Sequence, residues 1–342
     1  MEFGVNFSVF SENTYRICQS IAKYVLRNVN VNVFRLLLGP AKYFWETSSL
    51  VFHIAQDARF KNNLIFSEAH HLKTVNKKGT MVTWLVGRDE GYANGIGKNA
   101  RFRWLTGFLQ LNSTHSILVD KYNHCLRWLE RANNYVADYV GECENPGNSD
   151  GIGSAATLTN PSSLTRDANN DNRVFIAVKS ERDAIRILYL DTRKVETLDS
   201  SSSKPIFQDG VYAIVKDTSN AKAVLMTGNS SIARFQFPDS VTRISGAAES
   251  GFQDGTLENA LFNGTSSIVA IRRGVYIVAD SENHRLRVVD LVSGKVSSIC
   301  SGIAGYKPGT VAECNLDRPY ALFYLEDTLY VGATERIVKM EG

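Results

Sequence analysis

Three histidines occupy matching points of the sequence, which raises the question of a shared metal ion. His70, His124 and His284 each follow a short polar turn, and Asp120 and Asp280 precede the last two. Zinc needs its donors at about 2 Å from one centre, whereas these histidines belong to different repeats. We therefore expect each imidazole to bond its own turn, the two aspartates to accept turn hydrogen bonds, and no metal site to form.

A glycine-rich motif could also be interpreted as a phosphate-binding loop. Its copy at Gly147–Gly153 has spaced glycines but no Lys-Ser/Thr pair of the P-loop kind. The residues after it have the alternating pattern of strands. No Gly-x-Ser-x-Gly elbow occurs either, so we interpret the motif as a turn and expect no catalytic residue and no cofactor.

The same motif reveals how the chain is organised, because it recurs four times. Its frame is a glycine, a second glycine, a small residue and then Phe or Leu; the copies are residues 91–102, 147–158, 251–262 and 305–316. Neighbouring copies begin a little over about fifty residues apart, and the middle gap holds two units, which is the spacing of a repeat architecture.

Each copy precedes short runs of β-forming residues with alternating polarity, separated by turn residues. The clearest unit has four such runs between Ser267 and Cys300, and similar units follow Leu50, Gly107, Ser163 and Val211. The sequence therefore predicts an all-β, six-bladed β-propeller with four-stranded antiparallel blades. The fourth unit has lost its opening motif to a serine run at residues 200–203.

The two ends of the chain complete this prediction. The sixth unit, from Tyr320 to Gly342, has about three strands, and we expect a strand at residues 31–38 to fill the gap and so close the ring. An amphipathic helix is predicted at residues 14–28, packed on the propeller. The expected division is an N-terminal segment, residues 1–31, and a propeller, residues 32–342.

These repeats resemble those of the NHL-repeat propellers over residues 32–342. The family's Val-x-Asp followed by Asn-His and an arginine is matched by Val278 to Arg287 and by Val119 to Arg127. Weaker copies run from Glu68 to Lys73 and from Val178 to Arg186. The resemblance implies binding of protein or nucleic acid by one propeller face, with enzymes among a few members.

The cysteines favour two crosslinks and leave Cys18 over. Cys125 begins a strand and Cys143 lies just past the next one, so a disulfide between them is geometrically reasonable. Cys300 ends an outer strand and Cys314 lies in the following connection, so they could also pair. Cys314 replaces the repeat's small residue, however, and a buried free thiol is the alternative.

Composition and short motifs bear on the compartment. The 342 residues are 44% hydrophobic and 21% charged with a net charge of +3, which gives no field strong enough to favour nucleic acid. No apolar run approaches the length of a membrane span, and residues 1–13 do not have the pattern of a signal peptide. Sequons at Asn6, Asn112, Asn229 and Asn263, with two disulfides, nevertheless favour an extracellular protein over a cytoplasmic one.

We expect recognition on the face formed by the turns between second and third strands and by the links between blades. Candidate binding residues on that face are Lys121, Tyr122, Arg182, Glu282 and His284. The predicted function is a non-catalytic, monomeric recognition or scaffold propeller that binds a protein or other macromolecule. A metal-dependent lyase or lactonase and an intracellular RNA- or protein-binding propeller remain the alternatives.

Overall fold

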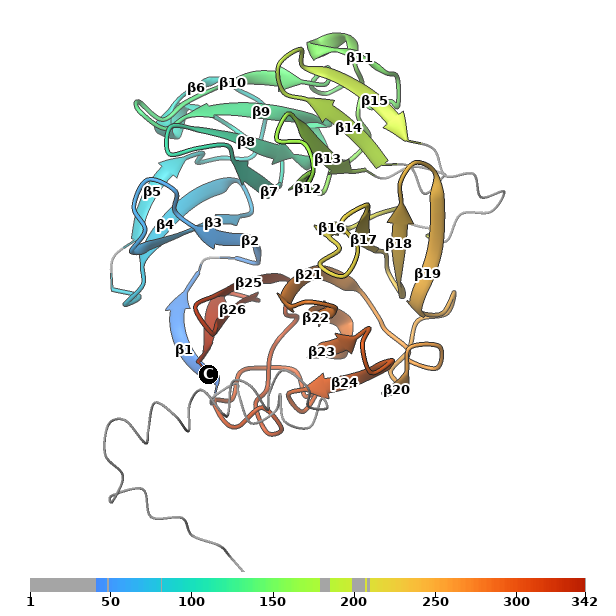
Figure 1. Cartoon of the computed structure of the whole chain (residues 1–342). Coiled ribbons are helices and arrows are strands. Elements are labelled where there is room, and N and C mark those ends of the chain that lie inside the picture. Colours follow the sequence, from blue (N-terminus) through green and yellow to red (C-terminus); the bar gives the residue numbers. More distant parts are fainter. Residues whose placement is uncertain are drawn as a thin grey trace, which may run out of the picture.

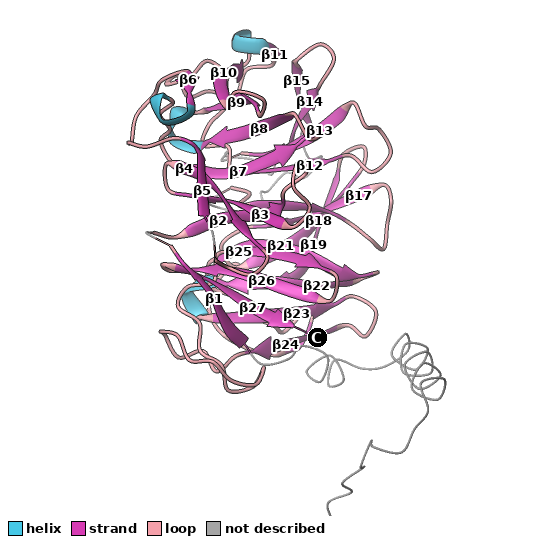
Figure 2. Ribbon diagram, turned by 90° about the vertical axis from the view of Figure 1, so that its left-hand side faces the viewer, coloured by secondary structure: helices cyan, strands magenta, loops and turns pink. Residues whose placement is uncertain are grey.

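The computed structural model describes residues 41–47, 49–80, 82–178, 185–198, 207 and 210–341. Its strands form six antiparallel sheets arranged as the blades of a ring (Figure 1). Seen from the side, the sheets stack around a common axis (Figure 2). The predicted six-bladed β-propeller is confirmed.

The blades follow the chain in order. Blade 1 has β2 (Val51–Gln56), β3 (Asn63–Glu68), β4 (His71–Asn76) and β5 (Val82–Val86). Blade 2 has β7 (Leu105–Gln110), β8 (His115–Asp120), β9 (Cys125–Glu130) and β10 (Tyr135–Val140). Blade 3 has β12 (Ser163–Arg166), β13 (Arg173–Ala177), β14 (Ile185–Tyr189) and β15 (Lys194–Leu198).

The second half repeats this plan. Blade 4 has β16 (Ala213–Lys216), β17 (Ala223–Thr227), β18 (Ser231–Gln236) and β19 (Ser240–Gly246). Blade 5 has β21 (Thr265–Arg272), β22 (Val275–Asp280), β23 (Arg285–Asp290) and β24 (Lys295–Ile299). Blade 6 has β25 (Ala321–Leu325), β26 (Thr328–Ala333), β27 (Arg336–Glu341) and, from the other end of the described chain, β1 (Ala41–Glu46).

The closing strand is not the segment expected from the sequence. Strand β1, Ala41–Glu46, pairs antiparallel with β27 and completes blade 6, so the placement of this strand at residues 31–38 was wrong. Phe44 explains the choice, since it is buried and packs edge-on against Tyr330 with ring centroids 5.5 Å apart. Residues 31–38 and the helix expected at 14–28 lie outside the described residues.

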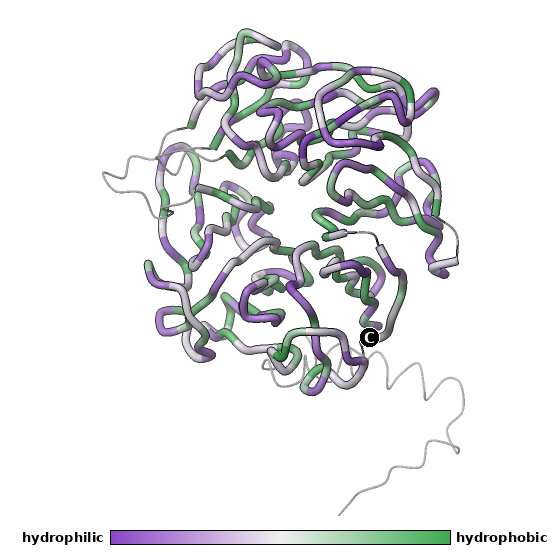
Figure 3. The backbone as a smooth tube through the Cα atoms, turned by 180° about the vertical axis from the view of Figure 1, so that it is seen from behind, coloured by the Kyte–Doolittle hydropathy of each residue, from purple (hydrophilic) through white to green (hydrophobic). Residues whose placement is uncertain are grey.

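The apolar core is divided among the joints between blades. Six clusters of buried side chains each join two neighbouring blades, for example Ile65 and Leu72 of blade 1 with Leu118 and Leu129 of blade 2. The inner strands contact one another around the axis in the order β2, β7, β12, β16, β21, β25 and back to β2. Hydrophobic stretches accordingly run through the blades (Figure 3). Each cluster is formed by two neighbouring blades, so all six clusters are shielded from solvent only when the ring is closed.

The glycine-rich motifs are turns that add a short edge strand to a blade. Strands β6 (Gly95–Ile96), β11 (Gly151–Ile152) and β20 (Gly255–Thr256) pair with β10, β15 and β24. The second glycine is required for different reasons in different copies: a Cβ at Gly151 would lie 2.6 Å from the carbonyl carbon of Ala155, whereas Gly95 and Gly255 have positive φ angles of 148° and 150°. The small residue of the frame is fully buried in each copy, as Ala100, Ala156, Ala260 and Cys314.

Candidate functional site

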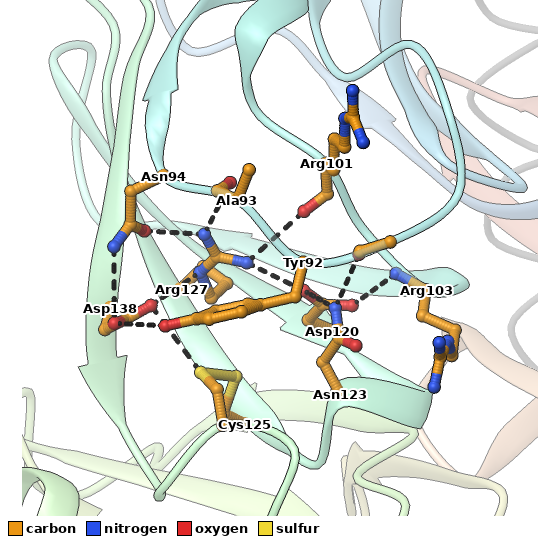
Figure 4. Close-up of polar contacts among 12 residues, drawn as sticks. Tyr92, Ala93, Asn94, Arg101, Arg103, Asp120, Asn123, Cys125, Arg127 and Asp138 are labelled. Atoms are coloured by element: carbon orange, nitrogen blue, oxygen red, sulfur yellow. Dashed lines mark hydrogen bonds and ion pairs between the residues drawn. A yellow bond between two sulfur atoms is a disulfide. The ribbon is translucent and has the colours of Figure 1, made fainter.

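The residues that the repeat motif brings together form a buried polar network, shown for blade 2 in Figure 4. The Arg127 guanidinium donates to Asp120 Oδ2 at 2.9 Å, to the Ala93 carbonyl at 2.9 Å and to Asn94 Oδ1 at 2.6 Å. Its Nε lies 3.1 Å from Asp138 Oδ1. Arg127 and Asp120 are fully buried, so this network fastens the glycine-rich turn onto the blade.

Blade 5 repeats three of these four contacts. Arg287 donates to Asp280 Oδ2 at 2.7 Å, to the Gln253 carbonyl at 2.6 Å and to Asp254 Oδ1 at 2.8 Å. In blade 3, Arg186 makes the equivalent bonds to the Ser149 carbonyl and to Asp150. The motif arginine is therefore a structural residue, a role that the sequence analysis did not assign to it.

The motif aspartates are held by the same networks. Asp120 accepts hydrogen bonds from the Asn123 amide at 2.8 Å and from the Arg103 backbone N–H at 2.8 Å. Burial raises the pKa of Asp120 to about 6, against the opposing effect of the Asn123 and Arg127 hydrogen bonds. The pKa of Asp280 is raised by burial as well. The turn hydrogen bonds expected for both carboxylates are confirmed, and their arginine partners are an addition.

The three matching histidines join neighbouring blades. His70 Nδ1 accepts a hydrogen bond from the Trp104 backbone N–H at 3.3 Å, and His284 Nδ1 accepts one from the Arg318 N–H at 3.2 Å. His124 does the same with Asn160 at 3.2 Å. The expectation that each imidazole bonds its own turn was wrong, because the link that starts the next blade passes within reach. Within the described ranges, no three His, Cys, Asp or Glu side chains are grouped to hold a metal ion.

Both expected cysteine pairs lie at disulfide distance. The Cα atoms of Cys125 and Cys143 are 5.0 Å apart, and those of Cys300 and Cys314 are 4.6 Å apart. The second pairing replaces the free thiol that the sequence left as an alternative. Cys18 lies outside the described residues.

The Cys125–Cys143 crosslink connects two segments of blade 2 that other blades connect by hydrogen bonds. Cys125 is the first residue of β9, and the first residues of β4 and β23 are His71 and Arg285. His71 Nε2 lies 2.7 Å from the Arg88 carbonyl oxygen, and Arg285 donates to the Ser301 carbonyl at 2.6 Å. In all three blades the start of the third strand is therefore tied to the link that follows the fourth strand.

The sequons differ in their surroundings. Asn112 lies in the exposed turn between β7 and β8, where its Oδ1 accepts hydrogen bonds from the Thr114 and His115 backbone N–H groups. Asn229 is half-buried and donates to Ser250 Oγ at 3.0 Å. The Asn263 sequon ends in Thr265, which is fully buried and bonded to the Gly228 carbonyl. Asn6 lies outside the described residues.

The expected binding residues share a face but not a cluster. Lys121 and Tyr122 lie in η3 (Lys121–Asn123) of blade 2, whereas Glu282 lies in η5 (Ser281–Asn283) of blade 5, on the far side of the ring, with His284 directly after it. Glu282 pairs with Arg318 at 3.7 Å. Arg182 lies outside the described residues.

Four aromatic side chains pack together on this face, near the axis of the ring. Trp104 packs against Tyr122 with ring centroids 5.9 Å apart, and Phe52 packs against both Trp104 and Tyr320 at 5.1 Å. Trp104 is 38% exposed and Tyr122 is 39% exposed. Sequence reasoning found only Tyr122 among these four. An aromatic residue next to the start of an inner strand was the signal available for the other three.

Comparisons with known proteins add information about the fold. No protein-family model matches the chain. A stretch of 60 residues, 17% of the chain, is 37% identical to the protein SUPPRESSOR OF QUENCHING 1, chloroplastic, of Arabidopsis thaliana, and spans 6% of that protein's length.

Among solved structures, the chain is similar to an auxiliary nutrient binding protein from Bacteroides ovatus, with a TM-score of 0.68 and 12% identity over 88% of this chain and 76% of that one. A similar protein from Bacteroides thetaiotaomicron gives a TM-score of 0.66 at 13% identity, with the same coverage of both chains. Virginiamycin B lyase from Staphylococcus aureus gives 0.57 at 10% identity over 88% and 99% of the two chains. At such identities these neighbours establish the propeller fold alone.

A membrane-spanning helix was not expected, and the described ranges contain none long and apolar enough to cross a bilayer.

Proposed function

We propose that the chain is an NHL-type recognition propeller that binds an extracellular macromolecule, without catalysis, through the face that carries Trp104 and Tyr122. The observation that carries the proposal is the exposure of these two rings, at 38% and 39%, beside the axis of a rigid ring. Exposed aromatic side chains on a fixed scaffold are typical anchors of a binding site. Neighbours named as nutrient binding proteins support a binding role.

The histidines and aspartates considered for metal binding or catalysis have structural partners here. The Nδ1 atoms of His70, His124 and His284 accept bonds from three separate blade links. Asp120 and Asp280 are buried under the motif arginines. The similarity to a lyase therefore has no matching group of reactive side chains among the described residues, and recognition is the better-supported function.

The extracellular assignment rests on the two cysteine pairs. Disulfides persist in oxidising compartments and are rare in the cytosol. Cys125–Cys143 and Cys300–Cys314 each tie a blade to the link beyond it. Solved neighbours include the extracellular domain of a putative hybrid two-component system from Bacteroides thetaiotaomicron.

A capture experiment tests the proposal. Biotinylated propeller, expressed through a secretory route, is incubated with the secreted and cell-surface fraction of its source organism, and the captured molecules are identified. The proposal predicts a reproducible partner that a Trp104→Ala/Tyr122→Ala double variant loses and that a Val292→Ser variant keeps. Val292 is 79% exposed in the turn between β23 and β24, on the opposite face. Equal capture by all three proteins contradicts it.

A nucleic-acid ligand gives a different result in the same assay. Binding to phosphates weakens steeply as salt rises, whereas binding through aromatic anchors changes little. If capture disappears with added salt and is unaffected by the Trp104 and Tyr122 substitutions, the result favours the alternative function, an intracellular nucleic-acid-binding propeller.

A further inference from the structure

One residue from each blade stands at the same level of the axis on the recognition face. Phe52, Thr106 and Ser266 are the bulge residues of β2, β7 and β21. Their counterparts directly before β12, β16 and β25 are Ser162, Tyr212 and Tyr320, whose backbone N–H groups all donate to the neighbouring second strand. We call these six residues the axial ring. It combines three aromatic residues with three residues that carry an aliphatic hydroxyl group.

Aromatic walls surround one side of the axial ring. Phe52 meets Tyr320 at an interplanar angle of 84° and Trp104 at 60°, and Trp104 meets Tyr122 at 77°. Nearby Tyr212 and Tyr122 contribute to the raised pKa of Tyr320, which places three phenols close together. Phe52 is buried, and the exposed rings of Trp104 and Tyr122 are steeply inclined to each other, so these two rings offer a face and an edge to a ring-shaped ligand.

The polar groups among these walls are neutral. Burial lowers the pKa of His53 to about 4 and raises that of Tyr320 to about 12. His53 lies on the innermost strand β2 and Tyr320 directly before β25, and both keep partial solvent exposure. The desolvation that keeps the imidazole and the phenol uncharged also disfavours a charged ligand at that depth.

Hydrogen-bonding capacity remains available in the axial ring. Thr106 contributes little to this capacity, because it is only 7% exposed and its Oγ1 is buried without a hydrogen-bond partner. Ser162 Oγ donates to the Val211 carbonyl at 2.8 Å, which leaves its oxygen free to accept. The backbone N–H groups of Ser162, Tyr212 and Tyr320 are used by the sheets, so no strand edge is offered to a peptide.

Two exposed arginines on the surrounding face lie near opposite charges. Arg103 lies 3.4 Å from Glu90, and Arg318 lies 3.7 Å from Glu282. Such exposed pairs leave little net charge to select an ionic ligand.

From the exposed, inclined rings of Trp104 and Tyr122, the accepting Ser162 hydroxyl and the nearby ion pairs, we propose that the axial ring with Trp104 and Tyr122 binds a neutral saccharide, presented by the macromolecule that this face recognises. A neutral sugar ring has an apolar face of C–H groups for stacking on Trp104 or Tyr122 and hydroxyls around its edge for the axial-ring oxygens. This inference rests on the proposed function and specifies its ligand.

The test is isothermal titration calorimetry of the intact, disulfide-bonded protein against defined probes. The neutral probes are cellotriose, maltotriose, mannotriose, xylotriose and triacetylchitotriose; trigalacturonic acid and a decaproline peptide represent a charged sugar and a peptide. At least one neutral trisaccharide should bind in the micromolar to millimolar range. Trp104→Ala should weaken it by about tenfold or more, and Trp104→Phe should retain most of the affinity because it keeps a stacking face.

Val292→Ser serves as the matched control on the opposite face and should bind like the wild type. The inference is overturned if no neutral trisaccharide binds at concentrations up to about 10 mM, if the charged sugar or the peptide binds in a Trp104-dependent manner instead, or if sugar binding ignores Trp104→Ala. The capture experiment then separates the two proposals. If it finds a macromolecular partner whose binding depends on Trp104 and Tyr122, the proposed recognition function stands and only the saccharide inference is rejected.

Discussion

His124 Nδ1 accepts a hydrogen bond from the backbone N–H of Asn160 at 3.2 Å, so a side chain of blade 2 holds the link that starts blade 3. His124 and Asn160 both have positive φ angles, 59° and 45°. Burial and the nearby Arg103 charge lower the pKa of His124, which keeps the imidazole neutral and its Nδ1 able to accept. The histidine of the repeat motif thus acts between blades.

We expect His124→Ala to reduce the free energy of unfolding by about 1–2 kcal/mol, because it removes this bond and leaves a left-handed backbone to alanine. His124→Asn should cost less, since asparagine tolerates that conformation. Chemical denaturation measures both. Excess zinc should leave the thermal midpoint of the wild type unchanged, and a zinc-dependent rise that His124→Ala removes would restore the metal interpretation.

The buried motif arginines should be positions at which substitution costs much stability. Arg127→Ala leaves Asp120 buried without its charge partner, and we expect a loss of about 3–5 kcal/mol in stability. Arg243→Ala, on the exposed side of β19, is the matched control and should change stability by less than about 0.5 kcal/mol. Similar effects of the two changes would refute the structural role of the network.

The Cys300–Cys314 crosslink should stabilise the joint between blades 5 and 6. The double variant Cys300→Ala/Cys314→Ala keeps the small buried residue that the motif requires at this point, so the loss should reflect the crosslink alone. With 14 residues of separation, we expect about 3 kcal/mol. Two comparisons would contradict the crosslink. If reducing the wild type does not change its denaturation midpoint, and the double variant has the same midpoint as the wild type, the two thiols are not joined in the native protein.

Acid should destabilise the protein in part through His53. Its pKa is about 4 when folded, because of burial, and about 6.5 when unfolded. Between these values the unfolded chain binds more protons, so stability is fully present above about pH 6.5 and is lost as the pH falls toward 4.

We therefore expect His53→Gln to remove about 2 kcal/mol of the stability difference between about pH 7 and pH 4.5. Denaturation curves of both proteins at the two pH values measure it. Equal acid sensitivity of wild type and variant would show that the imidazole is not held neutral on the inner strand.

If the chain is glycosylated, Asn112 should carry the glycan. Its side-chain amide lies in an exposed turn, and its Oδ1 bonds shape that turn without using the amide nitrogen. The amide of Asn229 already donates to Ser250. Peptide mapping of protein from a secretory host should find occupancy at Asn112, and Asn112→Gln should abolish the mass shift; occupancy confined to Asn229 or Asn263 would contradict this ranking.

The repeat motif made the propeller predictable because its glycines and small buried residues obey local rules of turn geometry. The closing strand was misplaced because several apolar segments precede the first blade, and only the pairing of Ala41–Glu46 with β27 selects among them. Phe52 and Tyr320 were missed for a related reason. Their contact joins blades 1 and 6, far apart in sequence, and depends on a bulge that the residue pattern does not mark.

The most direct test of the account compares ligand capture by the wild type, the Trp104→Ala/Tyr122→Ala double variant and Val292→Ser under identical conditions, with folding of all three verified by thermal denaturation. The account predicts that the double variant loses the partner while Val292→Ser retains it. Retention of the partner by the double variant, or its loss from Val292→Ser alone, would place recognition elsewhere and contradict the central claim.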